Sequence, residues 1–423
     1  MEPNLWLRNS ALGAVVLLGS VACGGEQDGD LRSDVEYEPA SLAEADAIAQ
    51  VVAASTEFGA ESLAELAQGE NLVLSPASIT VALAMLAEGA SGPAAEELEE
   101  LLGAEGAERS TAFNALRAAA LEYDGDPAVV QEDELPDTPV LHLANQLVLN
   151  ESATPEEDFL DALAAHFDAG VVTTDFGSQD SKNLLDAWVQ EHTGGLIEQS
   201  AVQAPDAALV FVLQNAILMA AQWQTQFDPS STSDRDFTTA DGGSVQAEMM
   251  QRTLETAYTE HDEAQVIRLP YTDGFAMDVV LPAAGSAPED FTAEDWAAVD
   301  DALAGGDRIP VELALPTLDL ETSQELVPLL EQMGYAEVIA GNDFSVIGSA
   351  VEISQVAHQA VLTVDEQGTV AAAVTEIAGV TSAPVDPPET VKMTVDRPYT
   401  LRIVHQETNW PLFMAVINDP TAG

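Results

Sequence analysis

The spacing of hydrophobic and polar positions divides the chain into an early part that favours helices and a later part that favours strands. Apolar residues recur near helical spacing at Ile48, Val51, Val52 and Phe58. The stretch 71–89 begins extended, is punctuated by Ser75-Pro76, and continues as a strongly apolar helix. Further helices are expected over 156–167 and 181–192. The run ALVFVLQNAILM at 208–219 is too apolar for a surface element and predicts a buried strand.

Strand signals dominate after about residue 235. The turn sequence YTDGF separates two of the predicted strands. Strands are expected at 265–269, 276–281, 311–315, 399–404 and 412–416, and a helix near 325–334. Since no change in composition divides residues 43–423, the pattern predicts a single mixed α+β domain.

The charge changes the expected surface. The 423 residues include 73 Asp and Glu but only 12 Lys and Arg, which gives a formal net charge of −61 at pH 7. Such a surface repels phosphate backbones and anionic lipid, so nucleic acid is not an expected partner. The hydrophobic content of 47% is that of a folded protein and argues against disorder. An acidic surface of this kind suits a high-salt habitat or selection for solubility.

The N-terminus has the features of a signal peptide. Arg8 supplies a positive charge, and the apolar run Ala11–Ala22 that follows is too short to span a bilayer. We therefore expect residues 1–22 to be a signal peptide.

Cys23 is the only cysteine, so no disulfide can form within the chain. It follows small residues and resembles the lipidated cysteine of a bacterial lipobox, although Ser20 stands where leucine is usual. The alternatives are an ordinary secretory signal that is cut near Ala22, or a cysteine that stays unmodified. We expect a lipidated Cys23 at the start of a flexible acidic tether, residues 23–42. The protein would then be a secreted or cell-envelope lipoprotein at the outer membrane, in the periplasm or on the extracellular face, held at the membrane only by its lipid anchor.

Signatures of catalysis are missing from the chain. It has no G-x-S-x-G, H-E-x-x-H, Walker or G-x-G-x-x-G motif. None of the six histidines is spaced as a metal-binding pair, so we expect neither a metal nor a cofactor. His358 is the one histidine in a strongly patterned segment, and a structural, hydrogen-bonded role is favoured for it. The chain is therefore predicted not to be an enzyme.

The most informative segment runs from Val351 to Asn418. It reads VEISQVAHQAVLTVDEQGTVAAAV, and later contains DRPY, PLFM and NDP. The order S-x-x-x-H-x-A-V-L-x-V-D-E-x-G-T followed by an alanine run closely resembles the C-terminal region of the serpin family of protease inhibitors. Motif residues that resemble the family along the chain are Asn71, Ser75, Pro76, Asn215, Trp223, His358 and Pro398. Local departures are Ala220-Ala221-Gln222 before Trp223, Thr317 and Val374.

The resemblance covers about residues 43–423 and implies the serpin fold. That fold has a large central β-sheet, further β-sheets, about eight or nine helices and an exposed reactive-centre loop, here at about 366–388. It also implies a monomer that acts as a suicide substrate for a serine protease. The protease forms an acyl-enzyme at the bait bond, and the cleaved loop inserts into the central sheet and traps it.

The loop sequence is compatible with insertion as a strand. Residues 369, 371, 373, 375 and 377 share one face and are small or apolar, while the only charge, Glu376, falls on the other. An ordinary alanine-rich helix is the alternative. The residues expected to form the hinge are Glu366, Gly368, Thr369, Ala371, Ala372 and Ala373.

The family's spacing, counted from Glu366, places the reactive bond at Ser382–Ala383, with Thr381–Ser382 as the alternative. A small residue before the bond favours an elastase-like or subtilisin-like target over a trypsin-like one. The rival hypothesis is a non-inhibitory serpin that acts as a surface binding or structural protein. Such members usually spoil the hinge with bulky or charged residues, whereas this hinge is small and unspoiled apart from Val374.

Overall fold

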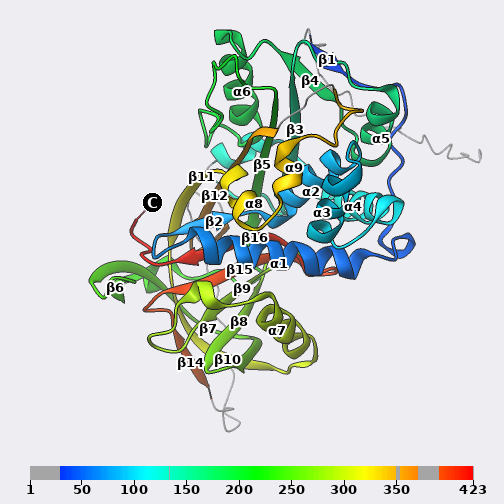
Figure 1. Ribbon diagram of the computed structural model, residues 1–423. Helices are drawn as coiled ribbons and strands as arrows, with labels where there is room; N and C mark the ends of the chain where they lie inside the picture. The colour runs from blue at the N-terminus through cyan, green and yellow to red at the C-terminus, as the bar shows by residue number, and fades with distance from the viewer. Residues whose placement is uncertain (1–28, 133, 349–352, 370–389, 423) are drawn as a thin grey trace, which may run out of the picture.

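The computed structural model describes residues 29–132, 134–348, 353–369 and 390–422, and shows two β-sheets with helices packed around them (Figure 1). The first sheet has seven strands in the order β1-β4-β3-β5-β13-β12-β11. Their bounds in that order are Asp30–Leu31, Val171–Thr174, Val140–Asn150, Phe211–Gln222, Gly368–Thr369, Ile353–Val364 and Leu318–Glu325.

The second sheet has nine strands, ordered β14-β10-β7-β8-β9-β15-β16-β2, with β6 paired to β7. Their bounds in that order are Val391–Thr394, Arg308–Pro316, Ser244–His261, Ala264–Pro270, Phe275–Leu281, Tyr399–His405, Trp410–Ile417 and Leu72–Leu74, with β6 at Ser233–Thr238. The sheet occupies the lower half of the molecule in Figure 1, where α7 packs beside it.

Nine α-helices lie within the described residues, in agreement with the predicted α+β class. They are α1 (Ile48–Leu66), α2 (Pro76–Ala87), α3 (Gly92–Leu102), α4 (Gly106–Leu121), α5 (Glu157–Phe167), α6 (Gln179–His192), α7 (Ala293–Gly305), α8 (Val327–Gln332) and α9 (Ala336–Ala340). Short 3-10 turns are η1 (Leu42–Glu44), η2 (Pro127–Gln131), η3 (Pro229–Ser231) and η4 (Pro288–Asp290). Within the described ranges, no helix is both long and apolar enough to cross a bilayer.

The helix predicted after Ser75-Pro76 is α2, and its sequence explains both its start and its place. The Ser75 hydroxyl accepts a hydrogen bond from the Ser78 amide at 3.1 Å, and Pro76 occupies the first turn. Every residue of α2 is buried, because the helix lies in the main core against β3, β5 and β16. It therefore fixes Ser75 beneath the centre of the first sheet.

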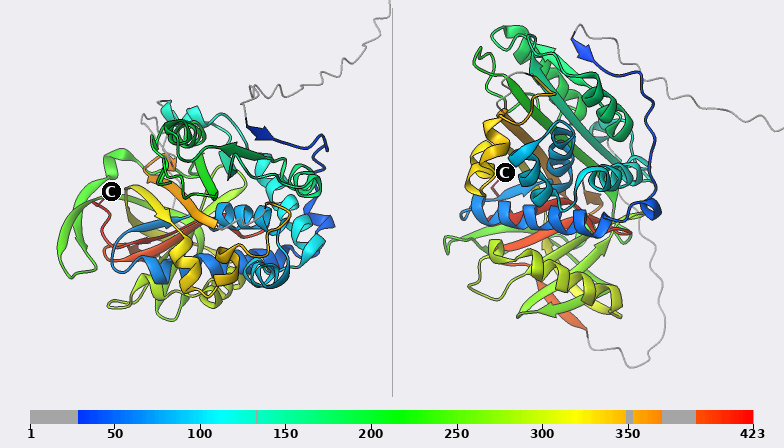
Figure 2. Two further views of the ribbon diagram at one scale, coloured as in Figure 1. Left: turned by 45° about the horizontal axis from the view of Figure 1, so that its top comes forward. Right: turned by 45° about the vertical axis from the view of Figure 1, so that its right-hand side comes forward.

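The predicted tether differs from the structure in its described part, residues 29–42. Asp30–Leu31 pair with β4 as an edge strand, and Asn114 of α4 accepts a hydrogen bond from the Ala40 amide at 2.7 Å. Arg32 pairs with Asp168, and the whole segment runs along the outside of the molecule before η1 (Figure 2, right). Several polar side chains of this segment bond to residues of α4 and to residues in or next to α5, so they do not all point into solvent. We call residues 30–40 the N-terminal strap.

Candidate functional site at the opening of the first sheet

The first sheet contains the beginning of an extra strand at one end only. Strands β5 and β12 pair directly, in parallel, from Phe211 and Ile353 as far as Ile217 and Ala360. Beyond that point β13 lies between them, and Thr369 is the partner of both Ala221 on β5 and Val364 on β12. The two strands therefore separate where the predicted loop leaves the sheet.

Gly368 and Thr369, which the sequence placed in the hinge, fill this gap. A Cβ on Gly368 would lie 2.0 Å from the Ala221 carbonyl oxygen, so only glycine allows the chain to pass. Thr369 is 1% exposed, and its hydroxyl lies 2.6 Å from the Tyr271 hydroxyl. Complete burial raises the pKa of Tyr271 far above its ordinary value, so the phenol stays protonated at this contact.

A tight turn over residues 365–367 brings the chain back into the sheet. One Asp365 carboxylate oxygen accepts from the amides of Gln367 at 2.8 Å and Gly368 at 3.1 Å. Burial raises the pKa of Asp365, while those two hydrogen bonds oppose the rise. Glu366 accepts from the Phe227 amide through its backbone oxygen at 2.8 Å, and its side chain accepts from the Thr232 hydroxyl.

Trp223 supports the turn from the end of β5. Its indole nitrogen donates to the Asp365 carbonyl and its amide donates to the Gln367 carbonyl, both at 2.8 Å. Its ring stacks on Tyr271 with centroids 4.5 Å apart. Trp223, Phe227 and Gln367 also line a groove of about 710 Å³ beside the turn. The family motif residue Trp223 therefore fixes the point at which the loop leaves the sheet.

His358 and Asn215 hold β12 and β5 together where the strands are still paired. His358 is fully buried, its Nε2 accepts from the Ser75 amide at 3.1 Å, and its Nδ1 lies 2.5 Å from Asn215 Oδ1. Because Nε2 accepts, the proton is on Nδ1 and is donated to Asn215. Burial lowers the pKa of His358 to about 3, so the ring is neutral. The predicted structural role of His358 has this geometric basis.

Asn71 directly precedes β2, close to the end of β16. Its side chain accepts from the Asn418 amide at 2.7 Å and donates to the Asp419 carbonyl at 2.6 Å. Asn71 therefore ties the start of β2 to the residues that follow β16 in the second sheet. Pro398 directly precedes β15.

Several predicted site residues lie outside the described ranges: Cys23, Ala371, Ala372, Ala373, Thr381, Ser382 and Ala383. Two residues of the site were not anticipated from the sequence as contacts of the hinge, namely Tyr271 and the turn carboxylate of Asp365. Tyr271 gave no such signal, since it lies in the turn sequence YTDGF almost a hundred residues before Thr369.

In the part of the chain that the structure describes, one group of three potential metal ligands comes together, at His261, Asp262 and Asp295. His261 already pairs with Asp295 at 2.9 Å, and Asp262 is 89% exposed. This arrangement is an ordinary hydrogen-bonded pair of His261 and Asp295, far in sequence and in sheet position from the hinge.

At this end of the first sheet, Gly368 and Thr369 lie as a short strand between β5 and β12. Comparison with known proteins agrees: residues 53–420 match the family described as serpin (serine protease inhibitor). The chain belongs to the serpin family. Proteins of this family are generally protease inhibitors that act as suicide substrates, some of them are non-inhibitory, and they are not enzymes.

Individual relatives are similar over most of their length. Iripin-8 of Ixodes ricinus is 31% identical over 82% of this chain and 88% of its own, and a serpin-like protein of Thermococcus kodakarensis is 29% identical over 88% and 86%. Among solved structures, native tengpin, a thermophilic serpin, superposes with a TM-score of 0.76 at 24% identity, over 91% of this chain and 97% of that one. The structural likeness supports the fold.

Proposed function

We propose that this serpin inhibits a serine protease as a suicide substrate, by inserting its cleaved loop between β5 and β12. The observation that carries the proposal is β13. Gly368 and Thr369 already occupy the gap between two strands that are otherwise paired, so insertion extends a strand that has begun. Each further residue adds backbone hydrogen bonds to strands on both sides.

Continuing the β13 register gives each loop residue a place in the inserted strand. Residue 371 would lie between Met219 and Leu362, and 373 between Ile217 and Ala360, all of which belong to the main core. The small side chains of Ala371 and Ala373 fit such positions without displacing neighbours.

The same register changes the interpretation of Glu376. It would lie beside Gln214, which is fully buried and donates to the Leu185 carbonyl of α6 at 3.1 Å. The face opposite the main core is therefore covered by α6 at this level. A buried carboxylate there costs several kcal/mol, so α6 must move away as the strand passes residue 376.

Insertion must also break the bond between His358 and Asn215. In the continued register, residue 375 would lie between His358 on β12 and Asn215 on β5. The hydrogen bond between His358 and Asn215 thus helps to keep β5 and β12 paired until cleavage frees the loop. A kinetically held native state of this kind is what the mechanism needs.

The test is to mix the protein with an elastase-like and a subtilisin-like protease and to separate the products on a denaturing gel. A covalent complex that survives denaturation is expected, together with a small C-terminal fragment whose mass identifies the bond as Ser382–Ala383 or Thr381–Ser382. Cleavage of the loop without any complex would instead establish the rival function, a non-inhibitory serpin with a surface binding or structural role.

We further propose that the protein is exported and lipidated at Cys23, so that the inhibitor acts at the cell envelope. The support is the apolar run before Cys23 and the small residues around it. Cys23→Ser should move the protein from the membrane fraction to the soluble fraction, and unchanged partitioning would refute lipidation.

A further inference from the structure

The few cations of this acidic protein are unevenly paired. Most described Lys and Arg side chains have a described carboxylate within 4.0 Å, and the four that do not are Arg117, Arg235, Arg252 and Arg308. Arg117 is half-buried on α4 and interacts with Tyr37 of the N-terminal strap. The other three lie on β6, β7 and β10, three adjacent strands of the second sheet. Among the described residues, no carboxylate lies within 4.0 Å of these three guanidinium groups, and the Asp228 carboxylate interacts with Arg252 only at longer range.

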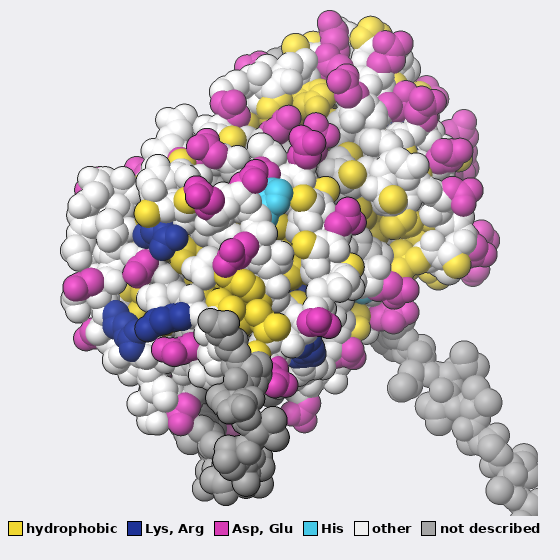
Figure 3. Space-filling view, turned by 90° about the horizontal axis from the view of Figure 1, so that it is seen from below, with side chains coloured by type: hydrophobic (Ala, Val, Ile, Leu, Met, Phe, Trp, Pro, Cys, Tyr) yellow, Lys and Arg dark blue, Asp and Glu magenta, His cyan; other side chains and the backbone are white. Residues whose placement is uncertain are grey.

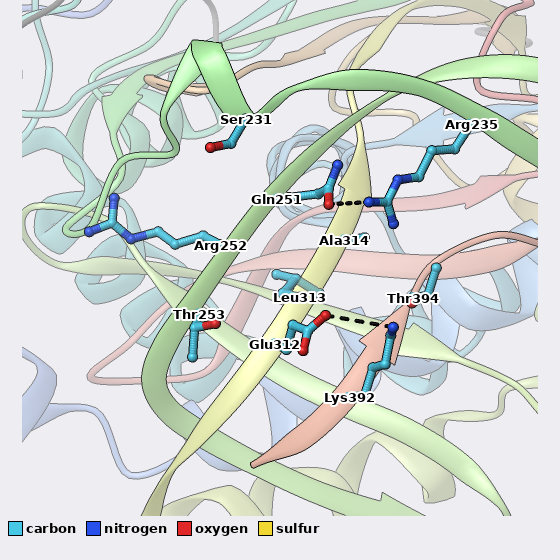
Figure 4. A pocket seen from close by; sticks show the side chains of 10 residues that line it. All are labelled: Ser231, Arg235, Gln251, Arg252, Thr253, Glu312, Leu313, Ala314, Lys392 and Thr394. Atoms are coloured by element: carbon cyan, nitrogen blue, oxygen red, sulfur yellow. Dashed lines mark hydrogen bonds and ion pairs between the residues drawn. The ribbon is translucent and has the colours of Figure 1, made fainter. Parts of the chain in front are cut away.

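Two of these arginines line one groove of about 460 Å³, together with Lys392 of β14 (Figure 4). We call this the cation groove. Arg235 donates to the neutral side chain of Gln251, and Arg252 donates to the backbone carbonyl of Gln226. Glu312, the only carboxylate among the described residues of the lining, lies 3.6 Å from Lys392 and compensates its charge. The groove therefore presents an excess of positive charge.

Neighbouring acidic residues on the same strands do not neutralise Arg235. Asp234 and Asp236 flank it along β6, but successive side chains of a strand point to opposite faces. The Asp236 carboxylate accepts from Gln246 instead. Figure 3 shows Lys and Arg side chains gathered at one side of the face seen from below, the end of the molecule where this sheet lies.

The groove is joined directly to the loop. Chain that leaves the first sheet at Thr369 returns as β14, whose Lys392 and Thr394 line the groove. The expected bond at Ser382–Ala383 precedes Lys392 by about nine residues, or roughly 30 Å when fully extended. A protease that holds this bond is therefore close enough to overhang the cation groove.

We propose that the cation groove is a second docking surface for the target protease, and that it binds an acidic patch on the protease beside its active site. The proposal rests on the proposed function for the identity of the partner. Its physical logic is electrostatic. A surface of net charge −61 repels an acidic protease, and the cationic side chains of Arg235, Arg252 and Lys392 in the groove reverse the sign where contact occurs.

The experiment measures the second-order rate constant for cutting the loop, with an acidic and a basic subtilisin-type protease, over a series of salt concentrations. This rate is defined whether the cut chain is trapped or released, so the result does not depend on inhibition. Arg235→Gln retains a side-chain amide beside Gln251, and Lys182→Gln on α6 is the control with the same change in charge. Lys182 lies in an ion pair with Asp186, at the opposite end of the molecule (Figure 1).

With the acidic protease at low salt, we expect Arg235→Gln to lower the rate about three-fold, and Arg235→Gln with Arg252→Gln to lower it about ten-fold. Lys182→Gln should change it less than two-fold, about the effect of net charge alone. The differences should vanish at high salt and be absent with the basic protease.

An equal effect of Lys182→Gln would overturn the proposal, since steering would then follow net charge and not the groove. An unchanged rate in both groove variants would do the same. If only the binding of dextran sulfate fell in the groove variants, the surface would be a polyanion site and not a protease dock. Covalent complexes that fail to form at all would refute inhibition while leaving the rate comparison intact.

Discussion

At the scale of single residues, the hinge depends on side chains that can be buried without charge. Gly368 passes the Ala221 carbonyl only because it has no Cβ, and the Thr369 hydroxyl finds the Tyr271 hydroxyl inside the core. Both positions exclude large or charged substitutes. They are therefore where a single substitution should separate cleavage of the loop from its insertion.

Thr369→Arg should convert the inhibitor into a substrate. Burying a guanidinium group beside Tyr271 without a partner costs several kcal/mol, so insertion would stall while the bait bond remains accessible. The gel should show complete cleavage and no covalent complex. Gln367→Arg places the same charge two residues earlier, at the half-buried turn, and should still form complexes. Complexes formed by Thr369→Arg at the original yield would show that insertion does not proceed through β13.

His358 should make the stability of the native state depend on pH. Burial lowers its pKa to about 3 from the 6.5 of an unperturbed histidine, so below about pH 6.5 the unfolded chain takes up a proton that the native state does not. Stability is then complete above about pH 6.5 and falls towards pH 3, by at most about 1.4 kcal/mol per pH unit. Burial, with His142 alongside, also lowers the pKa of His192 to about 4 and adds a fall of the same sign.

Urea unfolding midpoints between about pH 7 and pH 5 measure this slope. His358→Gln should flatten it, because an amide can accept from Ser75 and donate to Asn215 without titrating in this range. His166→Gln, at a half-buried position on α5, is the control for the loss of an imidazole elsewhere in the chain. A slope unchanged in His358→Gln would assign the pH dependence to other groups.

At the scale of elements, the sequence predicted those segments whose pattern is continuous. Helix α2 follows from Ser75, Pro76 and an unbroken apolar run, and β5 follows from the run at 208–219. Strand β7 was missed because its 18 residues change from one alternation to another at Met249 and Met250, which are both buried. Strand β13 has two residues, too few for any period, and the hinge was found through the motif instead.

The N-terminal strap was missed for a different reason. Its residues are acidic and polar, which is also the composition of a disordered linker. What orders it is a partner distant in sequence: Asn114, which is 2% exposed, accepts from the Ala40 amide and donates to the Glu38 carbonyl at 2.9 Å. No local pattern reveals such a pairing.

Asn114→Ala should release the strap. It leaves the Ala40 amide and the Glu38 carbonyl without these bonds, which costs about 1–3 kcal/mol. We expect faster hydrogen exchange and faster proteolysis within residues 30–40, with the rest of the fold intact. Asn183→Ala, at an exposed position of α6 with one 3.5 Å contact to Gln179, is the matched control and should change neither. Equal protection in both variants would mean that β1 alone holds the strap.

Locking β5 to β12 should block inhibition reversibly. Ile217 and Ala360 are direct partners in the pairing, and neighbouring strands are about 4.8 Å apart, within the range that a disulfide spans. In a chain that starts at residue 29, and so lacks Cys23, Ile217→Cys with Ala360→Cys should be cut without complex when oxidised and form complexes when reduced. The control, Ala144→Cys with Ala216→Cys, joins β3 to β5, which need not separate, and should inhibit in both states. Inhibition by the oxidised lock would contradict insertion between these strands.

At the scale of the whole molecule, repulsion among carboxylates opposes the compact state. With 73 Asp and Glu against 12 Lys and Arg, most carboxylates have no cation to pair with, and unpaired like charges are closer together in the folded protein than in the unfolded chain. Salt shortens the screening length from about 10 Å at 0.1 M to about 3 Å at 1 M. The fold should therefore be more stable at high ionic strength.

We expect the urea midpoint to rise as salt is added, most steeply at the lowest concentrations, where screening changes fastest. Sodium chloride and sodium perchlorate at matched ionic strength separate the two effects of salt. Both salts screen charge equally, but the two anions differ in their effect on apolar surface. A rise with both salts at low concentration is the signature of screening. A rise with chloride and a fall with perchlorate from the first addition would mean that charge repulsion is not what limits stability. The same screening weakens the attraction between the cation groove and an acidic protease. Salt that stabilises the inhibitor should therefore slow its capture of that protease, and the size of this effect should follow the local charge of the groove and not the net charge of the chain.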